Sequence, residues 1–141
     1  MTAKEMFEDL RHAKRQIQSK QMKLACMRET AGDVRSVSLT GMPHSPSPSY
    51  SAIPAIVEGL EELEEEIRLD KIAFAEKKQK VLDTIALLDN ISEQEILIKR
   101  EVMGMKWDTV SKELSYSKRW MFSLYKKALE ELSLILKNTA V

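Results

Sequence analysis

Cysteine, glycine and proline are all scarce in this chain of 141 residues, which has 43% hydrophobic and 31% charged residues. One cysteine, Cys26, excludes an internal disulfide and favours a reducing compartment. Four glycines and four prolines leave most of the chain free to form helix. The chain also lacks an apolar run of membrane-spanning length, and its start, MTAKEMFEDLRHAKR, lacks the apolar core of a signal peptide. We therefore expect an all-α, cytoplasmic protein without a membrane partner.

Net charge is absent as well, with 22 cationic and 22 anionic residues, but the charges are unevenly distributed. Residues 1–31 carry seven cations and four anions, residues 51–90 five and ten, and residues 91–141 nine and seven. The middle segment therefore repels phosphate. The last segment is only mildly basic, so any DNA-binding face there must be local, and a single copy should bind weakly. This favours a dimer or help from a partner.

Residues 1–90 predict an assembly module of two long helices with a heptad pattern, which is typical of coiled coils. The first seam contains Ala3, Leu10, Ile17, Leu24 and Ala31, alternating with Met6, Ala13, Lys20 and Met27. The second contains Ile53, Leu60, Ile67, Phe74, Val81 and Leu88, alternating with Ile56, Leu63, Asp70, Lys77 and Thr84. Asp70 and Lys77 would specify register or pairing. The helices could fold back as a hairpin or pair between two chains, so we expect a homo-oligomer, first of all a dimer.

Two segments of this module invite a chemical interpretation. The predicted loop 33–50 is rich in serine and proline and contains His44, but the chain has too few histidines and cysteines for a typical metal site. The acidic run 58–66 offers carboxylates mainly on a solvated face, where contact with a basic partner is the alternative to chemistry. No nucleophile accompanied by a base is visible. We therefore expect no enzyme activity, metal or cofactor.

Residues 91–141 predict three helices arranged as a helix-turn-helix unit. Ser92 and Glu95 form a capping-box pattern that would start the first helix, and Gly104 suits its end. Asp108 or Thr109 would open a short second helix, which stops at Ser115-Tyr116-Ser117. The third helix would start after Ser117 and bury one apolar side, formed by Met121, Leu124, Ala128 and Leu132.

The outer side of this third helix predicts a DNA interface. Residues 115–127 contain four cations and no anion, and cations and hydroxyls at the start of a recognition helix suit the major groove. The alternative is an ordinary helical bundle with a solvated basic face. The candidate DNA-binding residues are Lys106, Lys112, Ser117, Lys118, Arg119, Phe122, Ser123, Lys126 and Lys127.

This segment, from Ile91 to Leu132, resembles the C-terminal DNA-binding region of bacterial sigma factors. The similarity lies in the acidic helix opening Ser92-Glu93-Gln94-Glu95, the turn glycine Gly104, Val110 with Lys112-Glu113-Leu114, and Lys127-Ala128-Leu129. The resemblance implies that Lys118, Arg119, Phe122 and Ser123 face base edges, and that RNA polymerase is a second partner.

Two aromatic residues depart from the sigma pattern. Phe122 stands where that family often carries a cation, and Trp120 is bulky for the DNA side. Phe122 could contact a thymine methyl group or belong to the core. For the remaining positions, we expect Lys118, Arg119 and Ser123 to read bases, and Lys106, Lys112, Lys126 and Lys127 to hold phosphates.

The layout of the whole chain is similar to phage late-gene transcriptional regulators of the ArpU and RinA type. Sequence-specific DNA binding for transcription control, as an activator of phage late genes, is therefore the leading expectation. The alternatives are a protein-binding adaptor or sigma-factor regulator, and the DNA-recognition subunit of a phage packaging machine.

Overall fold

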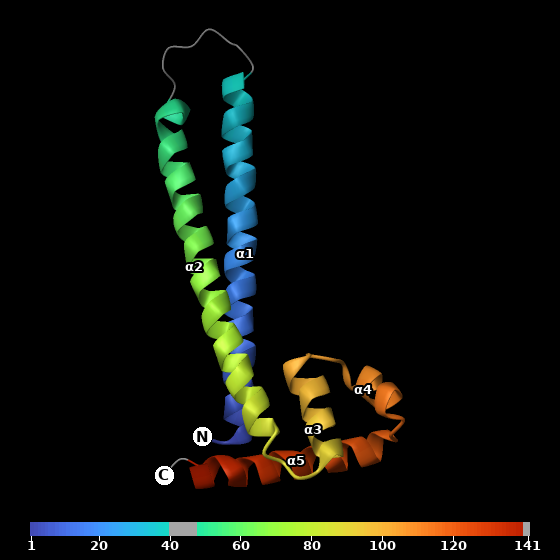
Figure 1. Ribbon diagram of the computed structural model, residues 1–141. Coiled ribbons are helices and arrows are strands. Elements are labelled where there is room, and N and C mark those ends of the chain that lie inside the picture. Colours follow the sequence, from blue (N-terminus) through green and yellow to red (C-terminus); the bar gives the residue numbers. More distant parts are fainter. Residues whose placement is uncertain (40–47, 140–141) are drawn as a thin grey trace. The chain divides into compact units, whose positions relative to one another are not determined.

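Every regular element described by the computed structural model is helical, as the sequence predicts. The model describes the backbone of residues 1–39 and 48–139 and the side chains of residues 1–33 and 54–139. The elements are α1 (Ala3–Leu39), α2 (Pro48–Ile85), α3 (Ile91–Leu97), the π-helical segment η1 (Ile98–Val102), α4 (Trp107–Leu114) and α5 (Lys118–Thr139) (Figure 1). Within these ranges, none of the helices has a stretch long and apolar enough to cross a bilayer.

The two long helices extend further than predicted. Helix α1 continues to Leu39, and α2 begins at Pro48, so the segment 33–50 that was predicted to be a loop is helical at both ends. No proline interrupts the chain before Pro43, and Pro48 occupies the first helical turn, where its missing N–H is not needed. Residues 40–47, which include His44, lie outside the described residues.

The chain forms two compact units, and their boundaries differ from the predicted division between residues 90 and 91. Unit 1 comprises Met1–His12 and Phe74–Val141, and unit 2 comprises Ala13–Ala73. The predicted division assigned the first turns of α1 and the last turns of α2 to the assembly module. Their apolar side chains instead share one core with α3, α4 and α5.

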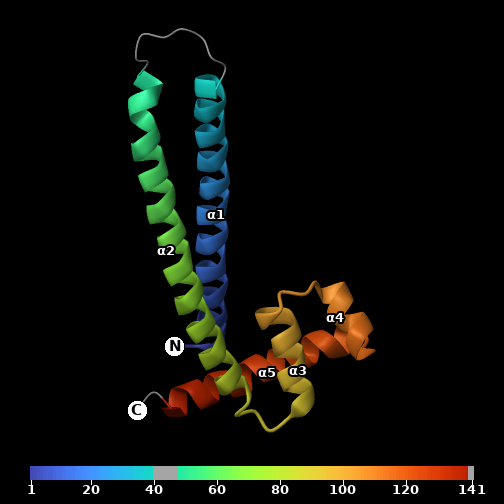
Figure 2. The ribbon, with the colours of Figure 1, turned by 45° about the horizontal axis from the view of Figure 1, so that its top comes forward.

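Unit 2 consists of the stretches of α1 and α2 that lie side by side (Figure 2). Leu24, Leu63 and Ile67 form its buried cluster. Lys20 Nζ lies 2.6 Å from Asp70 Oδ2, so two polar seam positions pair with each other. Arg28 of α1 pairs further along with Glu64 of α2 at 3.0 Å. Because the residue number rises on one helix while it falls on the other, the two helices run antiparallel here.

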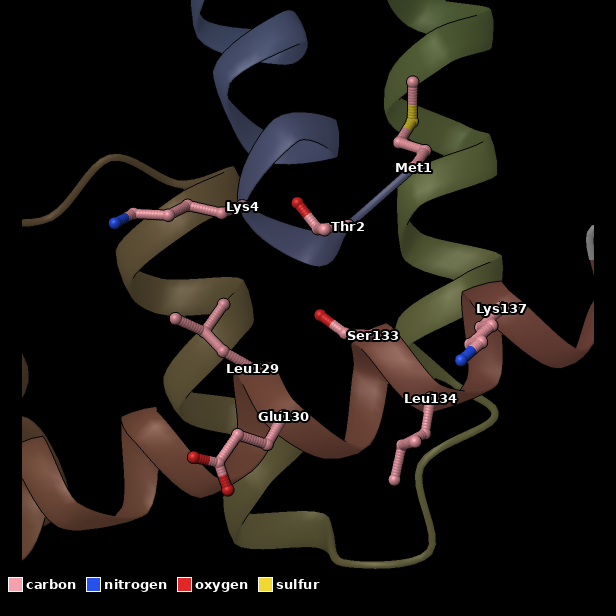
Figure 3. Close-up of a pocket in the computed structure, with 8 residues that line it drawn as sticks. All are labelled: Met1, Thr2, Lys4, Leu129, Glu130, Ser133, Leu134 and Lys137. Atoms are coloured by element: carbon pink, nitrogen blue, oxygen red, sulfur yellow. The ribbon is translucent and has the colours of Figure 1, made fainter.

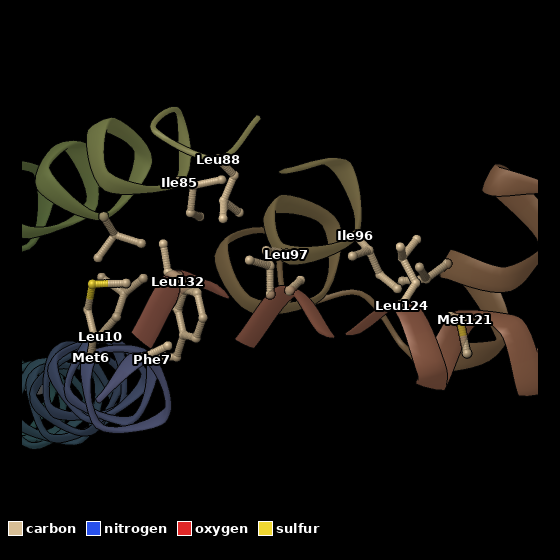
Figure 4. Packing of buried hydrophobic residues seen from close by; sticks show 14 residues of the cluster. Met6, Phe7, Leu10, Ile85, Leu88, Ile96, Leu97, Met121, Leu124 and Leu132 are labelled. Carbon is tan, nitrogen blue, oxygen red and sulfur yellow. The ribbon is translucent and has the colours of Figure 1, made fainter. Parts of the chain in front are cut away.

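Unit 1 has a continuous apolar core that draws on every helix (Figure 4). Its fully buried side chains include Phe7 of α1, Ile85 of α2, Leu97 of α3 and Leu132 of α5, each at most 1% exposed. Burial from several directions holds α5 firmly against the rest of unit 1. Its orientation in that unit is therefore set by packing rather than by its connecting turn alone.

Candidate nucleic-acid interface

A three-residue connection joins α4 to α5, where the sequence predicts it. Ser115 ends α4 with φ 57°, and its N–H reaches the carbonyl oxygens of Ser111 and Lys112. Ser117 then caps α5, because its Oγ accepts a hydrogen bond from the N–H of Trp120 at 3.2 Å. The hydroxyl of Ser111 donates to the carbonyl oxygen of Tyr116 at 2.6 Å. These bonds fix the point at which α5 starts.

The start of α3 differs from the prediction. Asn90, not Ser92, is the capping residue: its Oδ1 accepts the N–H of Ser92 at 2.9 Å. Asn90 has the extended backbone that a cap needs, and Ser92 already lies inside the helix. Ser92 instead accepts a hydrogen bond from the Tyr116 hydroxyl at 3.2 Å, which ties α3 to the connection before α5.

Two further boundaries are close to those predicted. Gly104 has φ 71°, the left-handed backbone for which glycine was expected. Helix α4 begins at Trp107, one residue before Asp108, and Lys106 precedes it without a side-chain capping bond. The π-helical segment between α3 and Gly104 has no signal in the sequence pattern.

The inner side of α5 is as predicted. Met121, Ala128 and Leu132 are 0% exposed and Leu124 is 5% exposed. The nine candidate DNA-binding residues are all exposed. The helix therefore separates an apolar side, packed on α3 and α4, from an outer side that carries cations and hydroxyls.

One of the candidate lysines, Lys118, pairs with a carboxylate at the start of α4. Lys118 Nζ lies 3.0 Å from Asp108 Oδ1, and both side chains are largely exposed. The hydrogen bond from Lys118 lowers the pKa of Asp108, and the charges of Lys112 and Lys106 lower it further. The structure thus pairs Lys118 of α5 with Asp108 of α4, and the charges of Lys106 and Lys112 also act on this carboxylate.

Arg119, Ser123 and Lys126 follow one another at helical spacing along the exposed side of α5. Within the described side chains, neither Arg119 nor Lys126 has an ion-pair partner. Lys127 differs, because its Nζ lies 4.0 Å from a carboxylate oxygen of both Glu93 and Glu131. Lys127 is therefore partly neutralised.

Aromatic side chains border the basic stripe, which Arg119, Ser123 and Lys126 form on the exposed side of α5. The Phe122 ring is centred 4.9 Å from that of Trp107, yet Phe122 remains 46% exposed, so it is neither a core residue nor free of packing. Trp120 is 54% exposed. The guanidinium of Arg100 lies 4.5 Å from the Trp107 ring centre, a cation–π distance. Sequence reasoning missed Trp107 and Arg100, because their pairing joins separate elements.

Sequence reasoning also missed two buried carboxylates in unit 1. Glu101 is 5% exposed, accepts a hydrogen bond from the Tyr125 hydroxyl, and lies 2.5 Å from Arg11 Nη1. Burial and the bond to Glu101 raise the pKa of Tyr125. The contacts join α1, η1 and α5 beneath the candidate interface.

Glu93, the second of these carboxylates, is 1% exposed, and its Oε2 has no hydrogen-bond partner among the described residues. Burial is the main cause that raises the pKa of Glu93 to about 7, the neighbouring carboxyl group of Glu131 adds to the rise, and Lys127 opposes it. Glu93, Leu97 and Glu101 are four residues apart, so helical periodicity could have shown that both acids share the buried side of Leu97.

Within the described residues, no group of three or more His, Cys, Asp or Glu side chains could hold a metal ion. Comparison with protein-family models, curated proteins and solved structures finds no match to this chain.

Proposed function

We propose that this protein is a sequence-specific DNA-binding regulator of transcription that acts in the cytoplasm on phage late genes as an activator. In this proposal, α4 and α5 form a helix-turn-helix with α5 as the recognition helix, and the heptad-patterned α1 and α2 form a hairpin that carries it. The observation that most supports this proposal is that α5 has one buried apolar side and one exposed polar side. Its inner residues are buried, whereas Lys118, Arg119, Ser123 and Lys126 are exposed at its N-terminal half.

Charge and hydrogen-bonding capacity suggest which of these residues would contact bases and which would contact phosphates. Arg119 and Ser123 would donate hydrogen bonds to base edges, as arginine and serine do in the major groove. Lys106, Lys112 and Lys126 would neutralise phosphates. Lys118 is held by Asp108 at 3.0 Å, so it must exchange this carboxylate for DNA. Loss of that pair limits the gain in affinity and makes Lys118 a weaker contributor than Arg119.

The direct test is selection of bound fragments from genomic DNA, followed by affinity measurements on the selected site at several salt concentrations. Affinity should fall steeply as salt rises. The double variant Arg119→Ala/Lys126→Ala should bind the site about 10- to 100-fold more weakly, because it loses a base contact and a phosphate contact. Its salt dependence should be shallower by about one released counterion per lost phosphate contact.

A matched control is Lys14→Ala/Lys23→Ala, which removes the same charge from exposed positions of unit 2. This control should keep the native affinity for the selected site. If both double variants lose affinity equally, the effect is one of total charge and α5 is not the recognition helix. Unchanged binding by the Arg119/Lys126 variant contradicts the proposal outright.

A protein-binding adaptor is the second candidate function, and exposed aromatic side chains favour it. Trp120 and Phe122 are 54% and 46% exposed beside the basic stripe, and aromatic residues with arginine are common anchors of protein interfaces. The resemblance to sigma factors makes RNA polymerase the first such partner to test. Trp120→Ala separates the two functions: it should weaken polymerase binding while leaving the salt dependence of DNA binding unchanged.

A further inference from the structure

An open groove of about 800 Å³ runs along the C-terminal half of α5 in unit 1, away from the basic stripe (Figure 3). Its lining residues are Met1, Thr2, Lys4, Leu129, Glu130, Ser133, Leu134 and Lys137. Leu134 is 60% exposed and Met1 is 72% exposed, so two large apolar side chains border the groove without being covered. Apolar side chains grouped beside a groove, unlike single exposed ones, are typical of an interaction surface.

The two charged residues that α5 contributes to the groove, Glu130 and Lys137, lie at opposite ends of its lining stretch. Figure 3 shows Glu130 and Lys137 on either side of Ser133 and Leu134. They are seven residues apart on α5, which is nearly two turns, so they project from the same side at a separation of about 10 Å along the axis. Within the described residues, neither Glu130 nor Lys137 forms an ion pair. On α5, the groove therefore offers one unpaired anion and one unpaired cation, and Lys4 of α1 adds a second cation.

This arrangement is complementary to itself. If two copies of α5 lie antiparallel about a two-fold axis that passes between positions 133 and 134, Glu130 of each copy faces Lys137 of the other. Leu134 of each copy then lies over Ser133 of the other, inside the groove. The same axis pairs the anion and the cation of each α5 and covers both leucines, whereas a partner of uniform charge would match only one of these two charges.

The heptad seam, at which the sequence allows pairing between two chains, is already occupied within the chain. In unit 2, the seam residues Leu24, Leu63 and Ile67 bury one another, and Lys20 is paired with Asp70. A second copy would have to displace these contacts to use the seam. At the α5 groove, Ser133 Oγ accepts the N–H of Ala3 at 3.1 Å, but Glu130 and Lys137 have no ion pair among the described residues that a second copy would have to displace.

We propose that a second copy of this chain is the occupant of the groove, so that the protein forms a symmetric dimer through the C-terminal halves of two α5 helices. The dimer joins the copies through the part of α5 that follows the basic stripe. It does not depend on DNA binding.

Sedimentation equilibrium of the whole chain tests this proposal. The mass should rise with concentration from 16.2 kDa toward twice that value. Leu134→Glu should keep the chain monomeric, because it places carboxylates in both grooves. Glu130→Lys and Lys137→Glu should each weaken the dimer at least tenfold by placing like charges opposite each other. The double variant Glu130→Lys/Lys137→Glu should restore the dimer, since it exchanges both charges across the same axis.

Leu69→Glu is the matched control, because Leu69 is an exposed leucine of unit 2, 52% exposed. It should leave the dimer intact. Circular dichroism should show native helix content in every variant, because the altered side chains lie at the surface. A chain that stays monomeric at every concentration overturns the proposal. So does a dimer that survives Leu134→Glu, that dissociates with Leu69→Glu, or that is not restored by the double charge reversal.

Discussion

Units 1 and 2 are built from the same two long helices, but they bury their side chains differently. In unit 2, α1 and α2 pack on each other, and among the described side chains the buried cluster consists of Leu24, Leu63 and Ile67. In unit 1, three more helices cover the ends of this pair. The core becomes large enough to enclose two carboxylates, Glu93 and Glu101.

This difference in burial explains why unit 1, rather than unit 2, can hold the side chains of a binding surface in a fixed orientation. A pair of helices leaves most of each helix exposed, so its ion pairs are at least partly solvated and contribute little. Packing from several directions holds a helix in one orientation. The candidate DNA-binding side chains of α5 lie on the unit with this deeper core, whereas unit 2 carries the acidic run and no candidate site residue.

The largest expected difference between the units is in core truncation. Leu97→Ala should lower the free energy of unfolding by about 3–5 kcal/mol, because Leu97 is 0% exposed and its removal leaves a cavity enclosed by several helices. Leu24→Ala in unit 2 should cost only about 2 kcal/mol, since the narrow seam can close or hydrate. Urea denaturation followed by circular dichroism measures both. Equal losses would mean that the two cores are equivalent.

Glu93→Gln should stabilise unit 1 in a pH-dependent way. The pKa of Glu93 is raised from 4.5 to about 7 in the folded chain, so the folded state binds its proton more tightly than the unfolded state. Ionised Glu93 therefore destabilises the fold above pH 7, and this penalty disappears as the pH falls toward 4.5. The glutamine variant should gain about 2–3 kcal/mol above pH 7 and little near pH 5.

Glu61→Gln, an exposed position of unit 2, is the control for this pH dependence. It should stay within about 0.5 kcal/mol of the native chain at all these pH values. A gain for Glu93→Gln that is the same at low and high pH contradicts the burial of an ionisable group as its cause.

Breaking one arginine–carboxylate pair in each unit compares how much such a pair stabilises the two units. Arg11 lies 2.5 Å from Glu101, whose side chain is 1% exposed, whereas Arg28 and Glu64 are 60% and 49% exposed. Arg11→Met should cost about 2 kcal/mol, because it removes a charged hydrogen bond from a buried acceptor. Arg28→Met should cost less than about 1 kcal/mol. Thermal unfolding of the two variants measures the difference, and the reverse order of stability would refute this account.

The smallest effects concern two glycines, for which the same substitution should have opposite signs. Gly104 in unit 1 has φ 71°, so Gly104→Ala should cost about 1 kcal/mol. Gly32 in unit 2 is helical, and an added Cβ meets nothing within 4 Å, so Gly32→Ala should stabilise by about 0.5–1 kcal/mol. The melting temperatures of the two variants should move in opposite directions. A shift in the same direction contradicts one of the two backbone assignments.

Local features were the most predictable from the sequence. The burial of Met121, Leu124, Ala128 and Leu132 and the cap at Ser117 depend on residues within a few turns of one another, so periodicity and capping patterns report them directly. The competition between Asn90 and Ser92 shows the limit of such patterns. Both are good capping residues, and backbone conformation decided between them.

By itself, the sequence determined that this chain is helical, which side of α5 faces inward, and that Lys118, Arg119, Ser123 and Lys126 lie outside. Only the tertiary structure decided that Phe7 and Ile85 share a core with Leu97, and that Glu93 and Glu101 are buried beneath the candidate interface. The physical reason is that a helical pattern shows which side of a helix must be covered. It does not show which distant segment covers it, because that depends on how all the apolar sides pack together.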